Sequence, residues 1–490
     1  MCYPDLKKYL EDAKNFTVIP VYSEIRADFE TPLSIYLKTR AKFLLESVEK
    51  GENVGRFSII TLGKKCTIKA VGSTFSIVEN NGESSLRKVK KMKNPLPAVR
   101  DYFSKIKVPA YEDLPPFFGG AIGYIGYEAI QYFESIPVKE NKNGIPDMLM
   151  VIPETILVYD SVKRTIFIIV TTFPREKPEK EYQAALSNID SMKEMLFRKL
   201  ELPEKKPSSW WSGFQSNMSK DHFLEGVRKS QKYIEEGEVI QVVLSQKFQV
   251  EQKCDEFEIY KTLRIINPSP YLFYMDFDDF FLIGSSPEVM VKLQGKELLI
   301  KPIAGTRPRG TTVSEDSQIA RELLADEKER AEHMMLVDLA RNDLGRVSKP
   351  GSVEVTDFMN IEKYSHVMHI VSTVKAEMDD SKDVFDLIPA VFPAGTLTGA
   401  PKIRAMQIIH ELEPERRGVY GGMVFYLGFN GNLDSCITIR TMLIKDGLAA
   451  VQAGAGIVAD SIPEKEYQES CNKAKALFKA VEKTCRRRTS

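Results

Sequence analysis

Two pairs of glutamates are candidates for metal chemistry because each pair can place two carboxylates on one face of a helix. Glu329 and Glu332 lie three residues apart in a stretch with helical periodicity, and Glu466 and Glu469 repeat that spacing near the C-terminus. Residues at this spacing share a helix face. Two such pairs could close on one hard cation, and an all-oxygen ligand set suits Mg²⁺ together with an anionic substrate. A single pair of this kind is more often a solvated helix face, so the metal interpretation needs further support.

The segment 301–310, KPIAGTRPRG, places two arginines on a loop stiffened by proline and glycine. Gly305 and Thr306 offer a close backbone approach and a hydroxyl group, and Arg307 and Arg309 follow at once. Because a guanidinium can bind a carboxylate through two parallel hydrogen bonds, this segment favours an anionic ligand that the two arginines face.

A second group of small and polar residues lies at the ends of apolar, strand-like runs. Gly454, Ala455 and Gly456 end one such run, and small residues there let backbone N–H groups approach an anion closely. Tyr420 precedes two glycines, and Arg440 lies within ITIRT. Neither glycine pattern is a Walker loop or a dinucleotide fingerprint. Together these residues fit a small ligand with two carboxylates, one bound to a metal and the other to arginine and backbone amides.

Composition excludes several classes of protein. The chain has 490 residues, 43% hydrophobic and 28% charged, which suits a globular protein of more than one domain. Lys+Arg and Asp+Glu are both 68, and this balance argues against a nucleic-acid-binding protein. Six scattered cysteines without a CxxC motif predict free thiols in a reducing compartment. Without a signal-peptide pattern or a run of about 18 apolar residues, we expect a cytoplasmic protein without a membrane span.

The elements that must position these residues alternate between helix and strand patterns. Helices are predicted at 32–48, 179–202, 220–236, 257–266, 319–344, 402–410 and 464–483. Strands are predicted at 58–63, 155–160, 165–170, 239–248, 271–277, 280–285, 422–429 and 436–444. Turn signals join several neighbouring strands as hairpins, and hairpins mixed with helices predict an α+β fold on antiparallel sheets. The stretch 203–209, rich in proline, lysine and serine, predicts a boundary between an N-terminal domain, 1–205, and a C-terminal domain, 206–490.

A series of ordered motifs carries a family resemblance. The motifs are SSPEVM, KPIAGTRPRG, ERAEHMMLVDLARNDLGRV, KYSHVMHIVS, GTLTGAPKIRA, YGG, ITIRT and VQAGAGIVADSIPEKEYQES. With them the chain resembles the chorismate-utilising enzymes, and most closely the large, chorismate-binding subunit (component I) of anthranilate synthases. The resemblance implies an α+β fold in which two intertwined domains pack large antiparallel β-sheets as a sandwich with surrounding helices.

The resemblance also implies roles for the glutamate pairs and the anion-binding residues. Glu332 and Glu469 match the Mg²⁺ ligands of the family, with Glu329 and Glu466 beside them, and the metal would hold the ring carboxylate of chorismate. The residues that match contacts to the substrate, chiefly to its enolpyruvyl carboxylate, are Tyr420, Arg440, Gly454, Ala455, Gly456, Gly305 and Thr306.

Other positions match the catalytic groups of the family and indicate the nucleophile. Glu288 matches the general acid that would protonate the departing 4-hydroxyl, and His369 and Thr396 match polar residues near the ring. Isochorismate and salicylate synthases carry a water-activating lysine where this chain has Gln241. Aminodeoxychorismate synthases carry a nucleophilic lysine where it has Ala304. With neither lysine, the resemblance implies that ammonia attacks ring C2, followed by loss of pyruvate to give anthranilate, the first committed step of tryptophan biosynthesis.

The resemblance finally implies partners and regulation. No glutaminase elbow with a nucleophilic cysteine is present, so a separate glutamine amidotransferase subunit would supply ammonia, in a heterodimer or heterotetramer. Ser47, Pro270, Tyr271 and Leu272 match the pocket through which tryptophan inhibits the family, with Leu272 replacing a methionine of some members. Two alternatives stay open: an aminodeoxychorismate or aminodeoxyisochorismate synthase, whose product keeps its pyruvyl group, and a catalytically silent tryptophan-sensing or partner-binding subunit.

Overall fold

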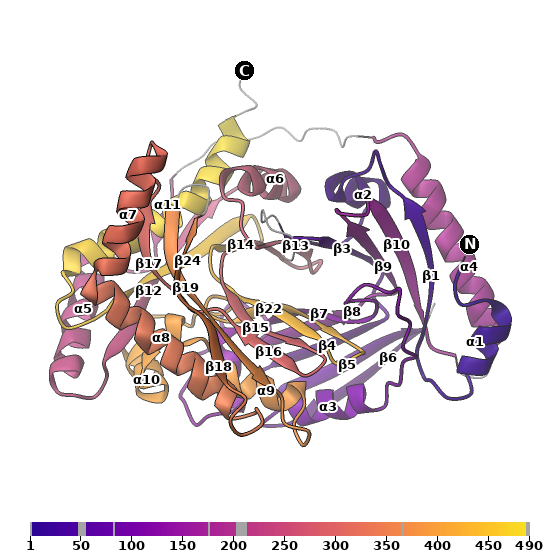
Figure 1. Cartoon of the computed structure of the whole chain (residues 1–490), viewed down its shortest axis with the longest axis horizontal. Coiled ribbons are helices and arrows are strands. Elements are labelled where there is room, and N and C mark those ends of the chain that lie inside the picture. The colour runs from indigo at the N-terminus through magenta and orange to yellow at the C-terminus, as the bar shows by residue number, and fades with distance from the viewer. Residues whose placement is uncertain are drawn as a thin grey trace.

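The computed structural model describes residues 2–47, 55–81, 84–174, 177–201, 213–363 and 367–486. Within them the chain forms two antiparallel sheets of 12 strands each, with helices on the outer faces (Figure 1). The predicted α+β class, built on antiparallel sheets that pack as a sandwich, is therefore confirmed.

The first sheet, sheet A, has the strand order β1-β10-β9-β3-β2-β13-β14-β23-β24-β12-β11, with β20 paired to β12. Its strands are β1 (Ile19–Arg26), β2 (Phe43–Glu46), β3 (Phe57–Leu62), β9 (Thr155–Asp160), β10 (Thr165–Thr172), β11 (Gln215–Ser216), β12 (Gln241–Glu251), β13 (Tyr271–Asp276), β14 (Phe281–Ser286), β20 (Gly399–Ala400), β23 (Thr441–Lys445) and β24 (Leu448–Ile457). The predicted hairpins β9–β10 and β13–β14 are both present.

The second sheet, sheet B, has the order β17-β19-β16-β15-β22-β21-β7-β8-β4-β5-β6, with β18 paired to β19. Its strands are β4 (Cys66–Val71), β5 (Thr74–Asn81), β6 (Ser84–Lys91), β7 (Gly120–Ile125), β8 (Met148–Ile152), β15 (Val289–Gln294), β16 (Glu297–Ile300), β17 (Ile303–Pro308), β18 (Glu354–Lys363), β19 (Val367–Glu377), β21 (Met423–Gly428) and β22 (Leu433–Ile437).

The two halves of the chain contribute to both sheets. An N-terminal strand joins a C-terminal strand at β2–β13 in sheet A and at β7–β21 in sheet B. Between the sheets, Tyr124 and Val151 of sheet B pack in one cluster with Phe43 and Phe273 of sheet A. The halves are therefore intertwined, as expected, while the predicted boundary at residue 205 lies outside the described residues.

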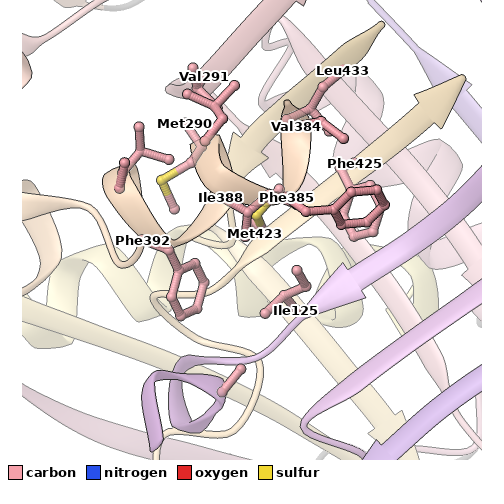
Figure 2. Close-up of a cluster of buried hydrophobic side chains, with 14 of the residues drawn as sticks. Ile125, Met290, Val291, Val384, Phe385, Ile388, Phe392, Met423, Phe425 and Leu433 are labelled. Carbon is pink, nitrogen blue, oxygen red and sulfur yellow. The ribbon is translucent and has the colours of Figure 1, made fainter. Parts of the chain in front are cut away.

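Helices cover the outer faces of both sheets. The described helices are α1 (Leu6–Asp12), α2 (Pro32–Thr39), α3 (Leu96–Ser104), α4 (Pro178–Phe197), α5 (Lys220–Glu235), α6 (Glu256–Ile266), α7 (Val313–Ala325), α8 (Glu327–Gly345), α9 (Val384–Val391), α10 (Lys402–Leu412) and α11 (Pro463–Arg486), with 3-10 turns η1 (Tyr127–Tyr132) and η2 (Gly395–Leu397). Figure 2 shows α9 on sheet B, with Phe385 and Ile388 next to Met423 and Phe425. On sheet A, α4, α6 and α11 bury apolar faces in a separate cluster. None of the described helices is long and apolar enough to cross a membrane.

Three predicted elements differ from the structure. The helix predicted at 32–48 ends at Thr39, because Arg40 takes a left-handed backbone (φ 52°) and the chain continues as strand β2. The single helix predicted at 319–344 is two helices, because the Asp326 side chain accepts from the N–H groups of Lys328 and Glu329 and starts α8. The strand predicted at 436–444 is split between β22 and β23, which lie in different sheets.

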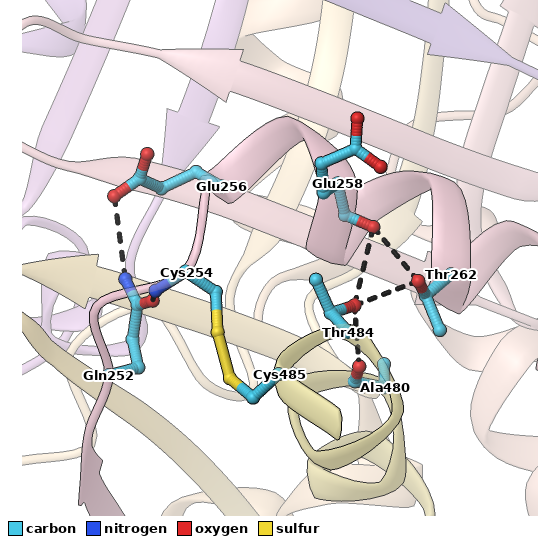
Figure 3. Close-up of a disulfide and its surroundings, with 8 residues drawn as sticks. All are labelled: Gln252, Cys254, Glu256, Glu258, Thr262, Ala480, Thr484 and Cys485. Atoms are coloured by element: carbon cyan, nitrogen blue, oxygen red, sulfur yellow. Dashed lines mark hydrogen bonds between the residues drawn. A yellow bond between two sulfur atoms is a disulfide. The ribbon is translucent and has the colours of Figure 1, made fainter. Parts of the chain in front are cut away.

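The expectation of six free thiols is wrong for two cysteines. Cys254 and Cys485 form a disulfide that joins the segment before α6 to the last turn of α11 (Figure 3). Next to it, the Thr484 hydroxyl donates to Thr262 Oγ1 at 2.8 Å. Spacing could not reveal this pair, because the two cysteines are separated by 231 residues. The other four cysteines are free.

Candidate active site

Two predicted site residues lie where the chain passes from one sheet to the other. Strand β14 of sheet A leads into β15 of sheet B, and Glu288 lies on that crossing. Strand β22 of sheet B leads into β23 of sheet A, and Arg440 lies on that crossing with a left-handed backbone (φ 48°). The Ile437 N–H donates to the Glu288 carbonyl at 3.0 Å, so the two crossings lie side by side.

Glu288 has the environment of a carboxylic acid rather than of a surface carboxylate. Its side chain is buried, and burial raises the pKa of Glu288 to about 7. The positive charges of Arg440 and Lys473 offset part of that rise, and Thr396 of η2 lines one small pocket together with Glu288. A carboxyl group with a pKa near neutrality can donate a proton at physiological pH.

His369 lies against the strand that carries Gly305 and Thr306. Thr306 and His369 are cross-strand partners in β17 and β19, next to a bulge at Gly305, whose backbone is left-handed (φ 64°). His369 Nδ1 lies 3.0 Å from the Gly305 carbonyl oxygen and 3.0 Å from Thr306 Oγ1. Because a carbonyl only accepts, this contact places the proton on Nδ1 and leaves Nε2 as an acceptor. Burial lowers the pKa of His369 and Arg440 lowers it further, so the ring is neutral at neutral pH.

The small residues of β24 pack closely against β12. Gly456 is the register partner of Val243, and Gly454 that of Ser245. A Cβ atom at Gly456 would lie 2.7 Å from Gln241 Nε2, and one at Gly454 would lie 2.5 Å from the Leu244 carbonyl oxygen. The close approach of the two backbones therefore requires glycine at position 454, whereas a side chain at position 456 would displace the Gln241 amide.

The four predicted metal-binding glutamates come from the first two turns of two helices. Glu329 and Glu332 lie on α8, and Glu466 and Glu469 lie on α11. Burial raises the pKa of Glu332, and the negative charges of Glu329 and Glu469 raise it further, so the two helices present their carboxylates to one another. Gln241 Nε2 donates to Glu332 Oε1 at 3.3 Å and ties β12 to this group.

Two of these carboxylates are bound to cations. Arg307 contacts Glu329 at 2.8 Å, and Lys473 contacts Glu469 at 2.6 Å and also donates to the Gly454 carbonyl at 3.1 Å. Among the residues that the structure describes, no three acidic, histidine or cysteine side chains are assembled as a metal-binding group. The four glutamates thus share one region but do not close on a common point.

The interpretation that Arg307 and Arg309 face an anionic ligand is not borne out. Arg307 binds the carboxylates of Asp326 and Glu329, and Arg309 binds Asp316 through two hydrogen bonds of 2.8 Å. Carboxylates of the chain therefore satisfy these cations, and their role is to attach the β17 segment to α7 and α8.

Sequence reasoning missed a buried ion pair next to Tyr420. Arg417 is 3% exposed and bonds Glu413 Oε1 at 2.6 Å and Oε2 at 2.9 Å. Its guanidinium lies over the Tyr420 ring, 5.5 Å from the centroid. Burial raises the pKa of Tyr420, so its phenol stays protonated. The segment 411–417 reads ELEPERR, and nothing in such a charged run shows that Glu413 and Arg417 are buried while Glu411 and Glu415 are exposed.

The four predicted inhibitor-binding residues line one cavity of about 620 Å³ between the sheets. Ser47 follows β2, while Pro270, Tyr271 and Leu272 lie at the start of β13; residues of β15, β21 and β22 form the opposite wall. The Ser47 hydroxyl is buried and has no hydrogen-bond partner among the described residues. The Tyr271 hydroxyl donates to Asp434 Oδ1 at 2.8 Å and links the two sheets across the cavity. The volume is typical of a small-molecule site.

Comparisons with known proteins identify the family of the chain. The sequence matches the family model described as chorismate binding enzyme over residues 41–479. It is 46% identical to the anthranilate synthase component 1 of Acetivibrio thermocellus, over 98% of this chain and 99% of that protein. The solved anthranilate synthase component I of Streptococcus pneumoniae is 36% identical, with a TM-score of 0.77 over 92% of this chain and 98% of that one.

A more distant structure shares the fold alone. The menaquinone-specific isochorismate synthase MenF of Escherichia coli is 19% identical, with a TM-score of 0.71 over 97% of this chain and 98% of its own.

The family model and the relative from Acetivibrio thermocellus show that the chain belongs to the chorismate binding enzymes and, within them, to the anthranilate synthase component 1 proteins.

Proposed function

We propose that this chain catalyses the amination of chorismate at ring C2 by ammonia, with loss of the 4-hydroxyl and of pyruvate, to give anthranilate for tryptophan biosynthesis. One observation carries the proposal. The chain has no lysine at position 241 or 304, the two positions where an amine would direct another reaction. Gln241 is buried with its amide on Glu332, so it supplies no base for water. Ala304 is buried on β17 and supplies no nucleophile.

In this proposal Glu288 delivers the proton that turns the 4-hydroxyl into water as it leaves. Hydroxide is a poor leaving group, so a positioned acid is needed. The pKa of about 7, raised by burial, keeps about half of the Glu288 side chains protonated at neutral pH. Thr396 lies beside Glu288, and the neutral His369 ring, oriented by the Gly305 carbonyl, can accept a hydrogen bond through Nε2 near the substrate ring.

The enolpyruvyl carboxylate would bind Arg440 together with the backbone of the Gly454, Ala455 and Gly456 strand and the Tyr420 hydroxyl. Arg440 is half-buried and its charge lowers the pKa values of both Glu288 and His369. A guanidinium in this position can bind a carboxylate of the substrate next to the acid that acts on its ring. Thr306 and Gly305 would line the same site from β17.

The donor chemistry of α8 and α11 fits Mg²⁺. Only oxygen ligands are offered, and burial together with repulsion from Glu329 and Glu469 raises the pKa of Glu332; a divalent cation would relieve that repulsion. Glu332 and Glu469 would hold the ion, with Glu329 and Glu466 beside them, and bound Mg²⁺ would supply charge neutralisation for the ring carboxylate. Arg307 and Lys473, which bind Glu329 and Glu469, would then have to release or share those carboxylates.

The cavity between the sheets is proposed to bind tryptophan as a feedback inhibitor. Its size suits an amino acid with an indole ring, and the Ser47 hydroxyl, which has no partner within the described part of the chain, offers a hydrogen-bonding group to the ligand. Strands of both sheets form its walls, so an occupant would contact the same two sheets that carry Glu288 and Arg440 on their crossings.

Ammonia is proposed to come from a separate glutamine amidotransferase subunit, in a heterodimer or heterotetramer. The choice of nitrogen source tests this directly. The purified chain should form anthranilate from chorismate with an ammonium salt and form none with glutamine alone. Addition of a glutamine amidotransferase component should then restore the glutamine-dependent reaction. Anthranilate from glutamine with the chain alone would contradict the proposed division of labour.

A further inference from the structure

Arg417 is a buried arginine whose hydrogen bonds leave its own segment. Beyond Glu413, its Nη1 donates to the Leu397 carbonyl at 2.6 Å and its Nη2 donates to the Val243 carbonyl at 2.6 Å. Glu413 in turn accepts from the backbone N–H and the hydroxyl of Ser245 on β12, at 2.9 and 2.7 Å. The side chain therefore joins three segments that are distant in sequence.

Each of those three segments carries a residue of the proposed substrate site or pairs directly with one. Leu397 directly follows Thr396, which lies beside Glu288. Val243 is the register partner of Gly456. The third segment carries Tyr420, whose ring lies under the guanidinium.

The geometry depends on arginine rather than on positive charge alone. A planar guanidinium can bind a carboxylate with one edge, donate to two carbonyls and lie over an aromatic ring at the same time. Its carbon also lies 4.7 Å from the centroid of the Tyr127 ring, contributed by the N-terminal half. The tetrahedral ammonium of a lysine could keep the ion pair with Glu413 and reach one carbonyl, but it would lose the planar contacts and the second carbonyl.

Neighbouring contacts hold the Arg417 backbone itself in place. The Glu128 carboxylate accepts from the backbone N–H groups of Arg417 and Gly418, at 2.7 and 2.8 Å. The adjacent Arg416 points to a different set of groups, the carboxylates of Asp147 and Glu128. Arg416 and Arg417 thus both form ion pairs with buried carboxylates. Of the two side chains, Arg417 is the one that contacts the segments of the proposed substrate site.

We propose that Arg417 is a positioning residue for chorismate binding, which holds the Thr396 turn, the strand opposite Gly456 and Tyr420 in register around one guanidinium. The proposal rests on the proposed function only in taking these three segments as the substrate site.

The test compares Arg417→Lys with Arg416→Lys as a matched control. Chorismate binding is measured by calorimetry in Mg²⁺ without ammonium, and KM and kcat are measured with free ammonia. For Arg417→Lys we expect Kd and KM for chorismate to rise at least about tenfold, since hydrogen bonds to a charged group are lost. Arg416→Lys keeps the positive charge beside Asp147 and Glu128 and touches none of the three segments, so we expect both constants within about twofold of the unaltered chain. A purely structural role would lower the active fraction, and with it kcat, while leaving KM and Kd unchanged.

Unchanged chorismate affinity in Arg417→Lys, or an equal loss in both variants, would overturn the proposal. If Arg417→Lys does not fold, Tyr127→Leu serves as the second variant, because it removes one ring contact of the guanidinium. It should raise Kd for chorismate at least about threefold, and an unchanged Kd in this variant would also overturn the proposal. Because binding is measured without turnover, a chain that binds chorismate but makes no anthranilate would refute the proposed function while leaving this inference standing.

Discussion

Replacing Glu288 by glutamine tests the proposed proton donor most sharply. Burial raises the pKa of this carboxyl from 4.5 to about 7, so at pH 7 about half of the molecules carry the proton. An ordinary glutamate would be protonated in only about 0.3% of molecules at that pH, so burial increases the acid form on the order of a hundredfold. The amide of glutamine preserves shape and burial but cannot deliver a proton.

We expect Glu288→Gln to lower kcat by roughly a hundredfold to ten-thousandfold, the usual contribution of general acid catalysis. Since the acid must be protonated in the free enzyme, kcat/KM for chorismate should fall as pH rises through about 7, when free ammonia is held constant. That descending limb should disappear in the variant.

The assay is anthranilate fluorescence across a pH series, with Glu297→Gln as a matched control on an exposed glutamate of sheet B. This control should keep kcat within about twofold of the unaltered chain. A Glu288→Gln enzyme that retains kcat within tenfold, or that keeps the same descending limb, would refute the assignment of Glu288 as the acid.

Three further perturbations test the metal, the regulatory cavity and the disulfide. Ser47→Phe should fill the cavity and relieve tryptophan inhibition without loss of turnover; inhibition curves that stay the same would place the regulatory site elsewhere. Glu332→Gln should abolish Mg²⁺-dependent turnover and weaken Mg²⁺ binding at least about tenfold by calorimetry, while unchanged binding would contradict the ligand assignment. Cys254→Ser should lower the free energy of unfolding by roughly 2–4 kcal/mol in denaturant titrations without reductant, because Cys485 then no longer closes a long loop. Equal stability of this variant and the oxidised chain would show that the disulfide is absent or without effect.

The sequence predicted the class of fold because strand and helix periodicities are local. It failed where one residue changes the direction of the chain without a glycine or proline signal. Arg40 and Arg440 both adopt left-handed backbones, which end α2 and separate β22 from β23. Asp326 did carry a signal, since an aspartate followed three residues later by Glu329 is typical of a helix N-terminus, but apolar periodicity continued through it.

The structure places Glu288, His369 and the Ser47 hydroxyl in buried surroundings, while their roles stay predictions. The candidate site was not predictable where long-range contacts decide the role of a charge. Arg307 lies in a motif that favours an anionic ligand, yet it binds Glu329 of α8. Arg417 lies in a charged run, yet its guanidinium is buried. Both outcomes depend on which segments the two sheets bring together, and local sequence does not encode that.

Product identification tests the central claim most directly. The purified chain is incubated with chorismate, Mg²⁺ and ammonium at mildly alkaline pH, and the products are identified by fluorescence and mass. The account predicts anthranilate and pyruvate in equal amounts. Isochorismate or salicylate would show that water is the nucleophile despite Gln241, and an aminated product that keeps its pyruvyl group would contradict the elimination step. No turnover, with chorismate still bound, would indicate a silent binding subunit.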